Sequence, residues 1–126
     1  PRGQHIWRRL DKALGDRTLH RPMKIENVTA TAKANVYFGG KVVSHTLVTA
    51  DGERKILGLI YPGKYHFGTE EAEDMVVVAG SCSVTLDGSE ESNVHAEGDT
   101  FSIPANSGFD IAVTEGICEY VCSFVA

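Results

Sequence analysis

The feature that most constrains the fold of this chain is a two-residue alternation of side chains that begins near Asn35. The alternating segments are rich in β-branched and aromatic residues, and turn signals such as Asp51-Gly52 and Pro62-Gly63 separate them at short intervals. A period of two places every second side chain on one face of a strand. Because no helical interval separates these strands, the pattern predicts an all-β sandwich or barrel.

Seven segments between turn signals are examples of the predicted strands. They cover residues 41–49, 54–61, 64–69, 75–79, 81–86, 109–114 and 117–125. The alternation is clear in two sets, each of which we expect to face one side of a sheet: Phe109, Ile111 and Val113, and Tyr120, Cys122 and Phe124.

Length and composition favour one folded domain. The chain has 126 residues, of which 42% are hydrophobic and 23% are charged. No apolar stretch approaches the roughly 20 residues that span a bilayer, and no secretory signal is recognisable. The formal net charge of −5 argues against a nucleic-acid partner. We therefore expect neither a membrane nor a nucleic acid as partner.

The charge is unevenly distributed along the chain. Residues 1–22 hold six basic and two acidic residues, a net charge of +4, whereas residues 23–126 have a net charge of −9. The break at Pro22-Met23 predicts that 1–22 is a basic N-terminal extension, appended or upstream of a single domain at 23–126 with its core at 35–126. Helical spacing in 6–14 predicts a short amphipathic helix there. The alternatives are a solvated extension, packing on a neighbouring chain, or contact with a membrane or nucleic acid.

Three cysteines, Cys82, Cys118 and Cys122, form no CxxC motif. In one strand, Cys118 and Cys122 would lie about 13 Å apart at 3.3 Å per residue, too far for a disulfide. We expect all three to be small buried side chains, which suits a reducing compartment and predicts a cytoplasmic protein.

Two stretches resemble the paired motifs of the cupin family. The first runs from Pro62 to Thr69 and ends on the spacing Glu73-x6-Gly80; the second opens as Gly98-x5-Pro104. This resemblance implies a cupin-type double-stranded β-helix, a small jelly-roll barrel.

The metal-ligand positions of that family are altered in this chain. Phe67 and Thr69 occupy the places of its HxH pair, Phe109 occupies the place of its last histidine, and Glu73 alone survives. His66 is one residue out of register and faces the other side of its strand. A first-row metal needs three or four converging ligands, so we expect no metal and no other cofactor. A cavity of aromatic, hydroxyl and carboxylate groups suits a small polar ligand with a flat ring.

A narrower resemblance covers residues 35–126. The residues that carry it are Tyr37-Phe38-x-Gly40-Lys41-Val42-x-Ser44, Arg54, Gly63-x-Tyr65-x-Phe67-x-Thr69, Glu73-x-Met75-x-Val77 with Gly80, Gly98, Phe101, Pro104, Ser107-x-Phe109 and Tyr120-x-Cys122. They resemble the pyrimidine/purine nucleoside phosphorylases, a bacterial family of small single-domain cupins without metal-binding histidines. The resemblance implies a homodimeric glycosyltransferase (pentosyltransferase). It would convert nucleosides such as uridine or adenosine, with phosphate as co-substrate, to free base and α-D-ribose 1-phosphate.

Phosphorolysis assigns expected roles to the charged and hydroxyl residues of this pattern. Arg54 is the main phosphate candidate because guanidinium presents a bidentate fork, and Lys41 is the second; the alternative for both is a solvated strand residue. Thr69 is expected to donate to phosphate or ribose. Glu73 is expected to accept from ribose hydroxyls and to stabilise an oxocarbenium-like sugar, or else to be one more solvated acid.

The remaining candidates would bind the nucleoside. Tyr65 and Phe67 share one face of a strand with Thr69 and would flank sugar or base, although both also suit a plain core. Phe109 would line the pocket, Ser107 would add a hydroxyl, and Tyr37 would close the mouth. Two other functions stay open. One is a non-catalytic cupin module that binds a sugar or nucleotide, and the other, less favoured, is a metal-dependent cupin enzyme.

Overall fold

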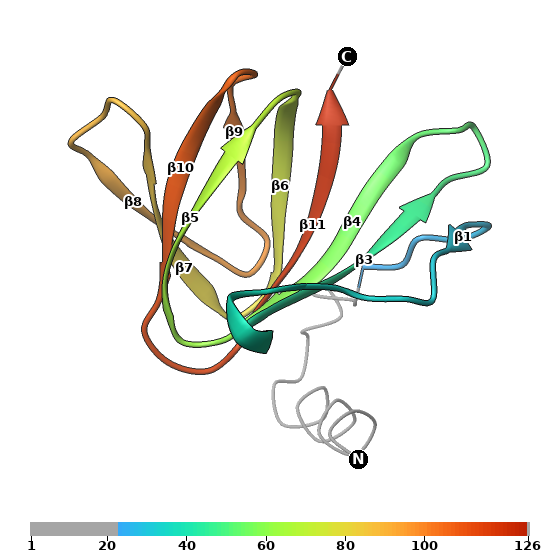
Figure 1. Cartoon of the computed structure of the whole chain (residues 1–126), viewed down its shortest axis with the longest axis horizontal. Coiled ribbons are helices and arrows are strands. Elements are labelled where there is room, and N and C mark those ends of the chain that lie inside the picture. The colour runs from blue at the N-terminus through green and yellow to red at the C-terminus, as the bar shows by residue number, and fades with distance from the viewer. Residues whose placement is uncertain (1–22, 126) are drawn as a thin grey trace, which may run out of the picture.

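The computed structural model describes residues 23–125, which form two antiparallel β-sheets packed face to face (Figure 1). The larger sheet contains β1 (Thr29–Ala30), β2 (Asn35–Tyr37), β3 (Val42–Val48), β4 (Arg54–Ile60), β6 (Ala72–Ala79), β9 (Thr100–Ile103) and β11 (Cys118–Val125). The smaller sheet contains β5 (Gly63–Thr69), β7 (Ser81–Leu86), β8 (Ser92–Ala96) and β10 (Ser107–Val113). A 3-10 turn, η2 (Phe38–Gly40), follows β2.

The strand order confirms the expected all-β jelly roll. The larger sheet runs β1-β3-β4-β11-β6-β9 with β2 also on β3, and the smaller sheet runs β5-β10-β7-β8. From β4 to β7 the chain changes sheet at every connection, and it does so again from β8 to β11. Such crossing between two sheets is what wraps a jelly roll around one shared core.

Gly80 makes one of these crossings possible. It lies between β6 and β7 with a φ of +77°, a conformation that side chains with a Cβ rarely adopt. A Cβ at this position would collide with the backbone carbonyl oxygen of Ile117. The glycine of the Glu73-x6-Gly80 motif is therefore a requirement of the corner where the chain leaves the larger sheet.

The core lies between the sheets and uses the predicted faces. Phe109, Ile111 and Val113 are all buried, as the alternation predicts. All three cysteines are free and buried, which confirms their expected state. Across residues 23–125, no helix has the length and apolar character needed to span a membrane.

Four short strands are not among the segments named from the sequence: β1, β2, β8 and β9. β8 shows the reason: it is an edge strand, and four of its five residues are exposed. A strand without a buried face carries no apolar alternation to detect. The predicted amphipathic helix and the boundary at Pro22-Met23 lie outside the residues that the structure describes.

Candidate active site

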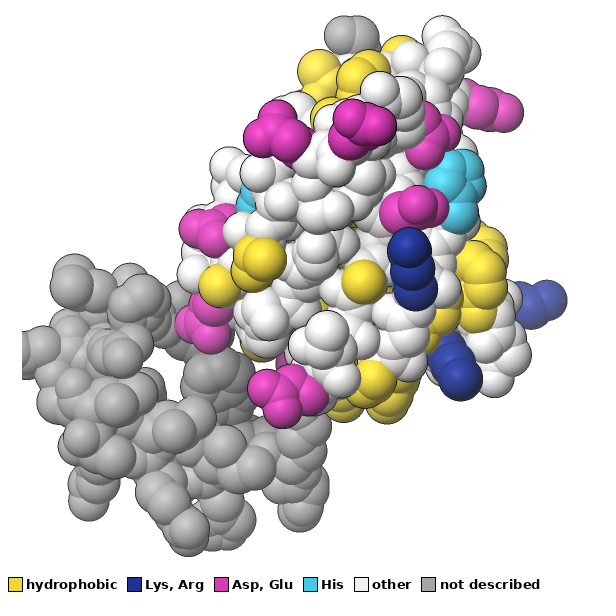
Figure 2. All heavy atoms as spheres, turned by 90° about the vertical axis from the view of Figure 1, so that its left-hand side faces the viewer, with side chains coloured by type: hydrophobic (Ala, Val, Ile, Leu, Met, Phe, Trp, Pro, Cys, Tyr) yellow, Lys and Arg dark blue, Asp and Glu magenta, His cyan; other side chains and the backbone are white. Residues whose placement is uncertain are grey.

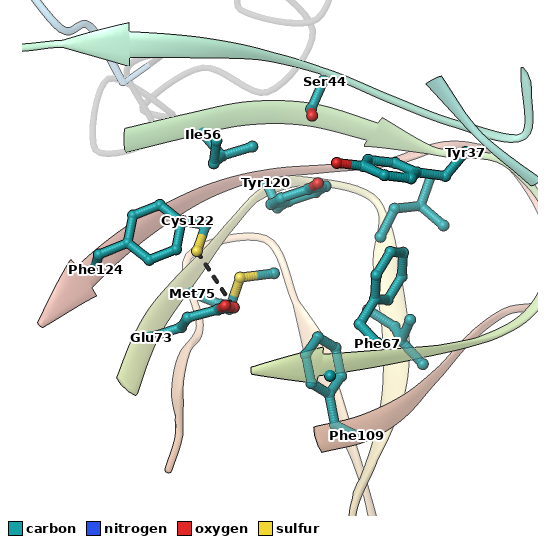
Figure 3. A pocket seen from close by; sticks show the side chains of 13 residues that line it. Tyr37, Ser44, Ile56, Phe67, Glu73, Met75, Phe109, Tyr120, Cys122 and Phe124 are labelled. Atoms are coloured by element: carbon teal, nitrogen blue, oxygen red, sulfur yellow. Dashed lines mark hydrogen bonds between the residues drawn. The ribbon is translucent and has the colours of Figure 1, made fainter. Parts of the chain in front are cut away.

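A cavity of about 320 Å³ lies between the two sheets (Figure 3). Its lining comes from both sheets and includes Tyr37 at the end of β2. The lining residues are Tyr37, Ser44, Ile56, Ile60, Phe67, Gly68, Glu73, Met75, Phe109, Ile111, Tyr120, Cys122 and Phe124. A space of this size suits a small molecule, and its walls are mostly apolar with few polar groups.

One wall is aromatic. Phe67 on β5 and Phe109 on β10 are register partners, and their rings stack with centroids 5.8 Å apart and planes 29° apart. Tyr37 meets the Phe67 ring edge to face at 6.1 Å. Figure 3 shows the rings of Phe67 and Phe109 bordering the same space as Glu73 and Tyr120. This wall presents flat apolar surface to a planar ligand.

Glu73 is the only carboxylate in the cavity lining. It lies near the start of β6 and accepts a hydrogen bond from the Cys122 thiol, with 3.5 Å between Sγ and Oε1. Burial raises the pKa of Glu73, and the nearby Glu71 carboxylate adds to that effect, while the Cys122 thiol and Arg54 oppose it. Because burial weakens competition from water, this carboxylate is well placed to bind hydroxyl groups of a ligand.

Arg54 lies beside the cavity, next to Glu73. Its guanidinium carbon is 4.0 Å from the ring centroid of Phe124, which lines the cavity, and its Nη2 donates to Glu71 Oε1 at 3.3 Å. The Arg54 side chain is half exposed, so its other N–H groups remain accessible. The ring and the carboxylate hold the guanidinium at this end of the cavity.

The rest of the described surface is dominated by acidic groups. Residues 23–126 have a net charge of −9, and Arg54 is the only arginine among residues 23–125. Figure 2 shows acidic side chains dispersed over the side of the molecule that carries β8. Attraction of an anion to the cavity therefore depends on local positive charge at Arg54.

The opposite end of the cavity carries hydroxyl groups from Ser44, Tyr37 and Tyr120 (Figure 3). Asn35 Nδ2 donates to Ser44 Oγ at 3.3 Å, and the Tyr120 hydroxyl lies near Ser44. Burial is the main cause that raises the pKa of Tyr120, with the neighbouring Cys122 and Tyr37 adding to it. Tyr120 therefore keeps its proton and remains a hydrogen-bond donor at neutral pH.

The position of Tyr120 depends on the absence of a side chain at Gly58. Ser44 on β3, Gly58 on β4 and Tyr120 on β11 are register partners in three adjacent strands. A Cβ on Gly58 would lie 2.6 Å from the Cζ and Oη atoms of Tyr120. The ring consequently crosses the face of the sheet above Gly58 and brings its hydroxyl to Ser44.

The structure places four of the nine predicted site residues in the cavity lining: Tyr37, Phe67, Glu73 and Phe109. It places Arg54 beside them, as described above. Lys41 follows η2 as an exposed residue and does not line the cavity.

The hydroxyl groups of Tyr65 and Thr69 are directed elsewhere, and Ser107 does not line the cavity. The Tyr65 hydroxyl donates to the backbone carbonyl oxygens of Tyr61 and Pro62 at 2.8 and 3.0 Å. The Thr69 hydroxyl donates to the Pro104 carbonyl oxygen at 2.7 Å and accepts from the Ser107 backbone N–H at 3.0 Å. These contacts hold the turn between β9 and β10 against β5. The predicted contacts of these three residues with a ligand have no support from this geometry.

Sequence reasoning did not select Ser44, Tyr120 or Cys122 as site residues, although all three line the cavity. Alternation along 117–125 placed Tyr120 and Cys122 on one face, which was a usable signal. Nothing in the local pattern placed that face opposite Ser44, because this depends on the register of three strands.

The donor set offers little to a metal ion. Within residues 23–125 no group of three or more His, Cys, Asp or Glu side chains is arranged to hold one. Phe67 and Phe109 point into the cavity where the cupin pattern has histidines, and they cannot ligate. The arrangement is instead suited to binding a polar ligand between an aromatic wall, a carboxylate and hydroxyl groups.

Comparison with known proteins gives a consistent result. The family model of pyrimidine/purine nucleoside phosphorylase matches residues 32–124. A pyrimidine/purine nucleoside phosphorylase of Paraburkholderia xenovorans is 50% identical over 102 residues, which cover 81% of this chain and 95% of that protein. One of Clostridioides difficile is 48% identical over 103 residues, covering 82% of this chain and 97% of the relative.

A solved structure agrees with the fold. It is a protein of unknown function from Acinetobacter sp. ADP1, which superposes with a TM-score of 0.78 at 38% identity and covers 81% of this chain and 98% of that one. With the family model matching most of the described residues and relatives near 50% identity aligned along almost their whole length, the chain belongs to the pyrimidine/purine nucleoside phosphorylase family.

Proposed function

We propose that this protein is a nucleoside phosphorylase, a pentosyltransferase that acts on purine and pyrimidine nucleosides such as adenosine and uridine. A phosphate oxygen forms a bond to C1′ of the ribose while the glycosidic C–N bond breaks. The bonding electrons leave with the base, which takes up a proton, and the second product is α-D-ribose 1-phosphate. Phosphate is the nucleophile, so the reaction needs neither a covalent intermediate nor a cofactor.

The observation that carries the proposal is that Arg54 and Glu73 lie at the same end of a mostly apolar cavity. Glu73 and Phe124 are register partners on β6 and β11, and Arg54 packs on Phe124. A cation for phosphate and a half-buried carboxylate for the sugar therefore lie side by side. Both demands of the reaction, binding an oxyanion and stabilising positive charge on the ribose, are met at this end.

Arg54 is assigned to phosphate. One N–H group donates to Glu71, and the cation–π contact with Phe124 fixes the plane of the guanidinium. The N–H groups that remain can bind two phosphate oxygens at once, which positions the nucleophile below the sugar.

Glu73 is assigned to the ribose. Glu73 lines the cavity, and its carboxylate accepts hydrogen bonds from the 2′- and 3′-hydroxyls. Its negative charge also stabilises the oxocarbenium-like sugar as the glycosidic bond lengthens. The aromatic wall of Phe67 and Phe109 accommodates bases of different size because stacking does not depend on their edge groups.

The test is phosphate-dependent release of free base. Purified protein is incubated with adenosine or uridine, with and without phosphate, and in parallel with a metal chelator. We expect base and ribose 1-phosphate only when phosphate is present, and no loss of activity on chelation. Binding of nucleoside without turnover would instead support the non-catalytic cupin module, and loss of activity on chelation would support the metal-dependent enzyme.

Arg54→Ala should raise the KM for phosphate at least tenfold, with a smaller effect on the KM for nucleoside. Lys64→Ala is the matched control, because Lys64 is an exposed lysine on β5 that lies outside the cavity lining. An unchanged phosphate KM in Arg54→Ala contradicts the assignment of Arg54. The homodimer and the cytoplasmic location stay predictions, which gel filtration and cell fractionation address.

A further inference from the structure

The cavity has a charged end and a hydroxyl end, separated along two paired strands. Phe124, which carries the Arg54 guanidinium, is a register partner of Glu73, and Tyr120 lies four residues earlier on β11. Four residues of β-strand span about 13 Å. Between the two ends, the middle of the wall consists of Cys122, Met75 and Ile56, which offer no strong hydrogen-bonding group.

The chemistry of the reaction decides which end receives the base. Direct displacement at C1′ brings phosphate to one face of the ribose while the base leaves from the other. With phosphate on Arg54 and the ribose hydroxyls on Glu73, the base must extend away from the charged end. It then lies between the aromatic wall and the hydroxyl end.

Tyr120 lines the cavity, and its hydroxyl lies near Ser44. The Asn35 amide N–H donates to Ser44 Oγ, so this oxygen already accepts one hydrogen bond. The Tyr120 O–H is available as a donor to a ligand in the cavity. Because the Tyr120 ring lies directly over Gly58 on the face of the sheet, its hydroxyl has a defined position.

We infer that Tyr120 binds the base, its hydroxyl donating a hydrogen bond to the acceptor atom beside the glycosidic nitrogen, which is N3 of a purine or O2 of a pyrimidine. Natural purines and pyrimidines carry an acceptor at this position, whereas their other edges differ in donors and acceptors. A single donor here therefore serves both classes of base. It also stabilises the negative charge that the leaving base acquires. The inference rests on the proposed phosphorolysis, which sets the direction of the nucleoside in the cavity.

The experiment pairs the loss of the hydroxyl with the loss of its acceptor. The kcat/KM values for adenosine and for 3-deazaadenosine, which has a C–H group in place of N3, are measured for the wild type, Tyr120→Phe and Tyr37→Phe. Tyr61→Phe is the matched control, since Tyr61 is an exposed tyrosine outside the cavity lining. Comparing the two substrate ratios cancels the different intrinsic reactivity of the two nucleosides.

We expect the wild type and Tyr61→Phe to prefer adenosine, and Tyr120→Phe to lose about threefold to tenfold of that preference, with the phosphate KM unchanged. Where turnover is too slow, the ratio of the two nucleoside dissociation constants, measured by titration calorimetry without phosphate, gives the same comparison. The inference is overturned if Tyr120→Phe keeps the full preference, or if Tyr37→Phe loses it instead. A wild type that releases no adenine from adenosine in the presence of phosphate contradicts the proposed function itself, which is a separate result.

Discussion

Gly58→Ala adds a single methyl group to the face of the larger sheet, and we expect it to displace the Tyr120 side chain that lines the cavity. The new Cβ would lie 2.6 Å from Tyr120 Cζ and Oη and 2.7 Å from Cε1. Ordinary contact needs about 3.5 Å, so the ring has to move by about 1 Å, into the cavity and away from Ser44.

The expected change in the free energy of unfolding is the sum of three contributions. Overpacking costs about 1–3 kcal/mol, and the weakened polar contact of the Tyr120 hydroxyl with Ser44 costs up to about 1 kcal/mol. The lower backbone entropy of the unfolded chain offsets about 0.4–1 kcal/mol, because the φ of Gly58 lies outside the left-handed region and suits alanine. We expect a net loss of about 1–3 kcal/mol in the free energy of unfolding. Displacing the donor by about 1 Å should also lower kcat/KM for nucleosides by tenfold to a hundredfold.

Urea unfolding of four proteins tests this reasoning: the wild type, Gly58→Ala, Tyr120→Leu and the double variant. Leucine lacks the Cε1, Cζ and Oη atoms that meet the new Cβ, so Gly58→Ala should be neutral or slightly stabilising in the Tyr120→Leu background. The coupling free energy should be about 2 kcal/mol, with unchanged m-values. An equal cost of Gly58→Ala in both backgrounds would refute the proposed clash with Tyr120.

Two further predictions concern Glu73 and Thr69. Burial raises the pKa of Glu73 above its ordinary value of 4.5, so ionising this carboxyl in the folded protein costs folding free energy. Glu73→Gln should therefore be at least as stable as the wild type near pH 7. Its gain in the free energy of unfolding should disappear as the pH falls below about 4. The kcat of Glu73→Gln should fall at least tenfold. The acidic limb of the wild-type pH–rate profile, which has its midpoint above 4.5, should be absent from the profile of this variant. Full activity in Glu73→Gln contradicts the assignment of Glu73 to the ribose. Thr69→Val removes the hydrogen bonds to the Pro104 carbonyl and the Ser107 N–H and should lower the free energy of unfolding by about 1–3 kcal/mol, whereas the exposed control Thr114→Val should change it by less than about 0.5 kcal/mol. Equal urea midpoints for the two valine variants contradict this structural role of Thr69.

The sequence pattern predicted which candidate side chains face inward, but it did not predict which of them reach the cavity. Phe67 and Phe109 were predicted to face inward from alternation and from the cupin spacing, and both line the cavity. Thr69 satisfies the same alternation and is 8% exposed, yet its hydroxyl is committed to the Pro104 carbonyl. Alternation predicts which face of a strand a side chain lies on, but it does not predict whether that side chain reaches the cavity.

The sequence by itself determined the all-β class, the inward faces of the long strands and the replacement of the metal-binding histidines, because these depend on spacing within one strand or one motif. The tertiary structure decided which groups meet across strands. Ser44, Gly58 and Tyr120 are separated by up to 76 positions in the chain and become neighbours through the register of β3, β4 and β11. Register depends on turn geometry and on the packing of whole sheets, so the hydroxyl end of the cavity was not visible in any local pattern.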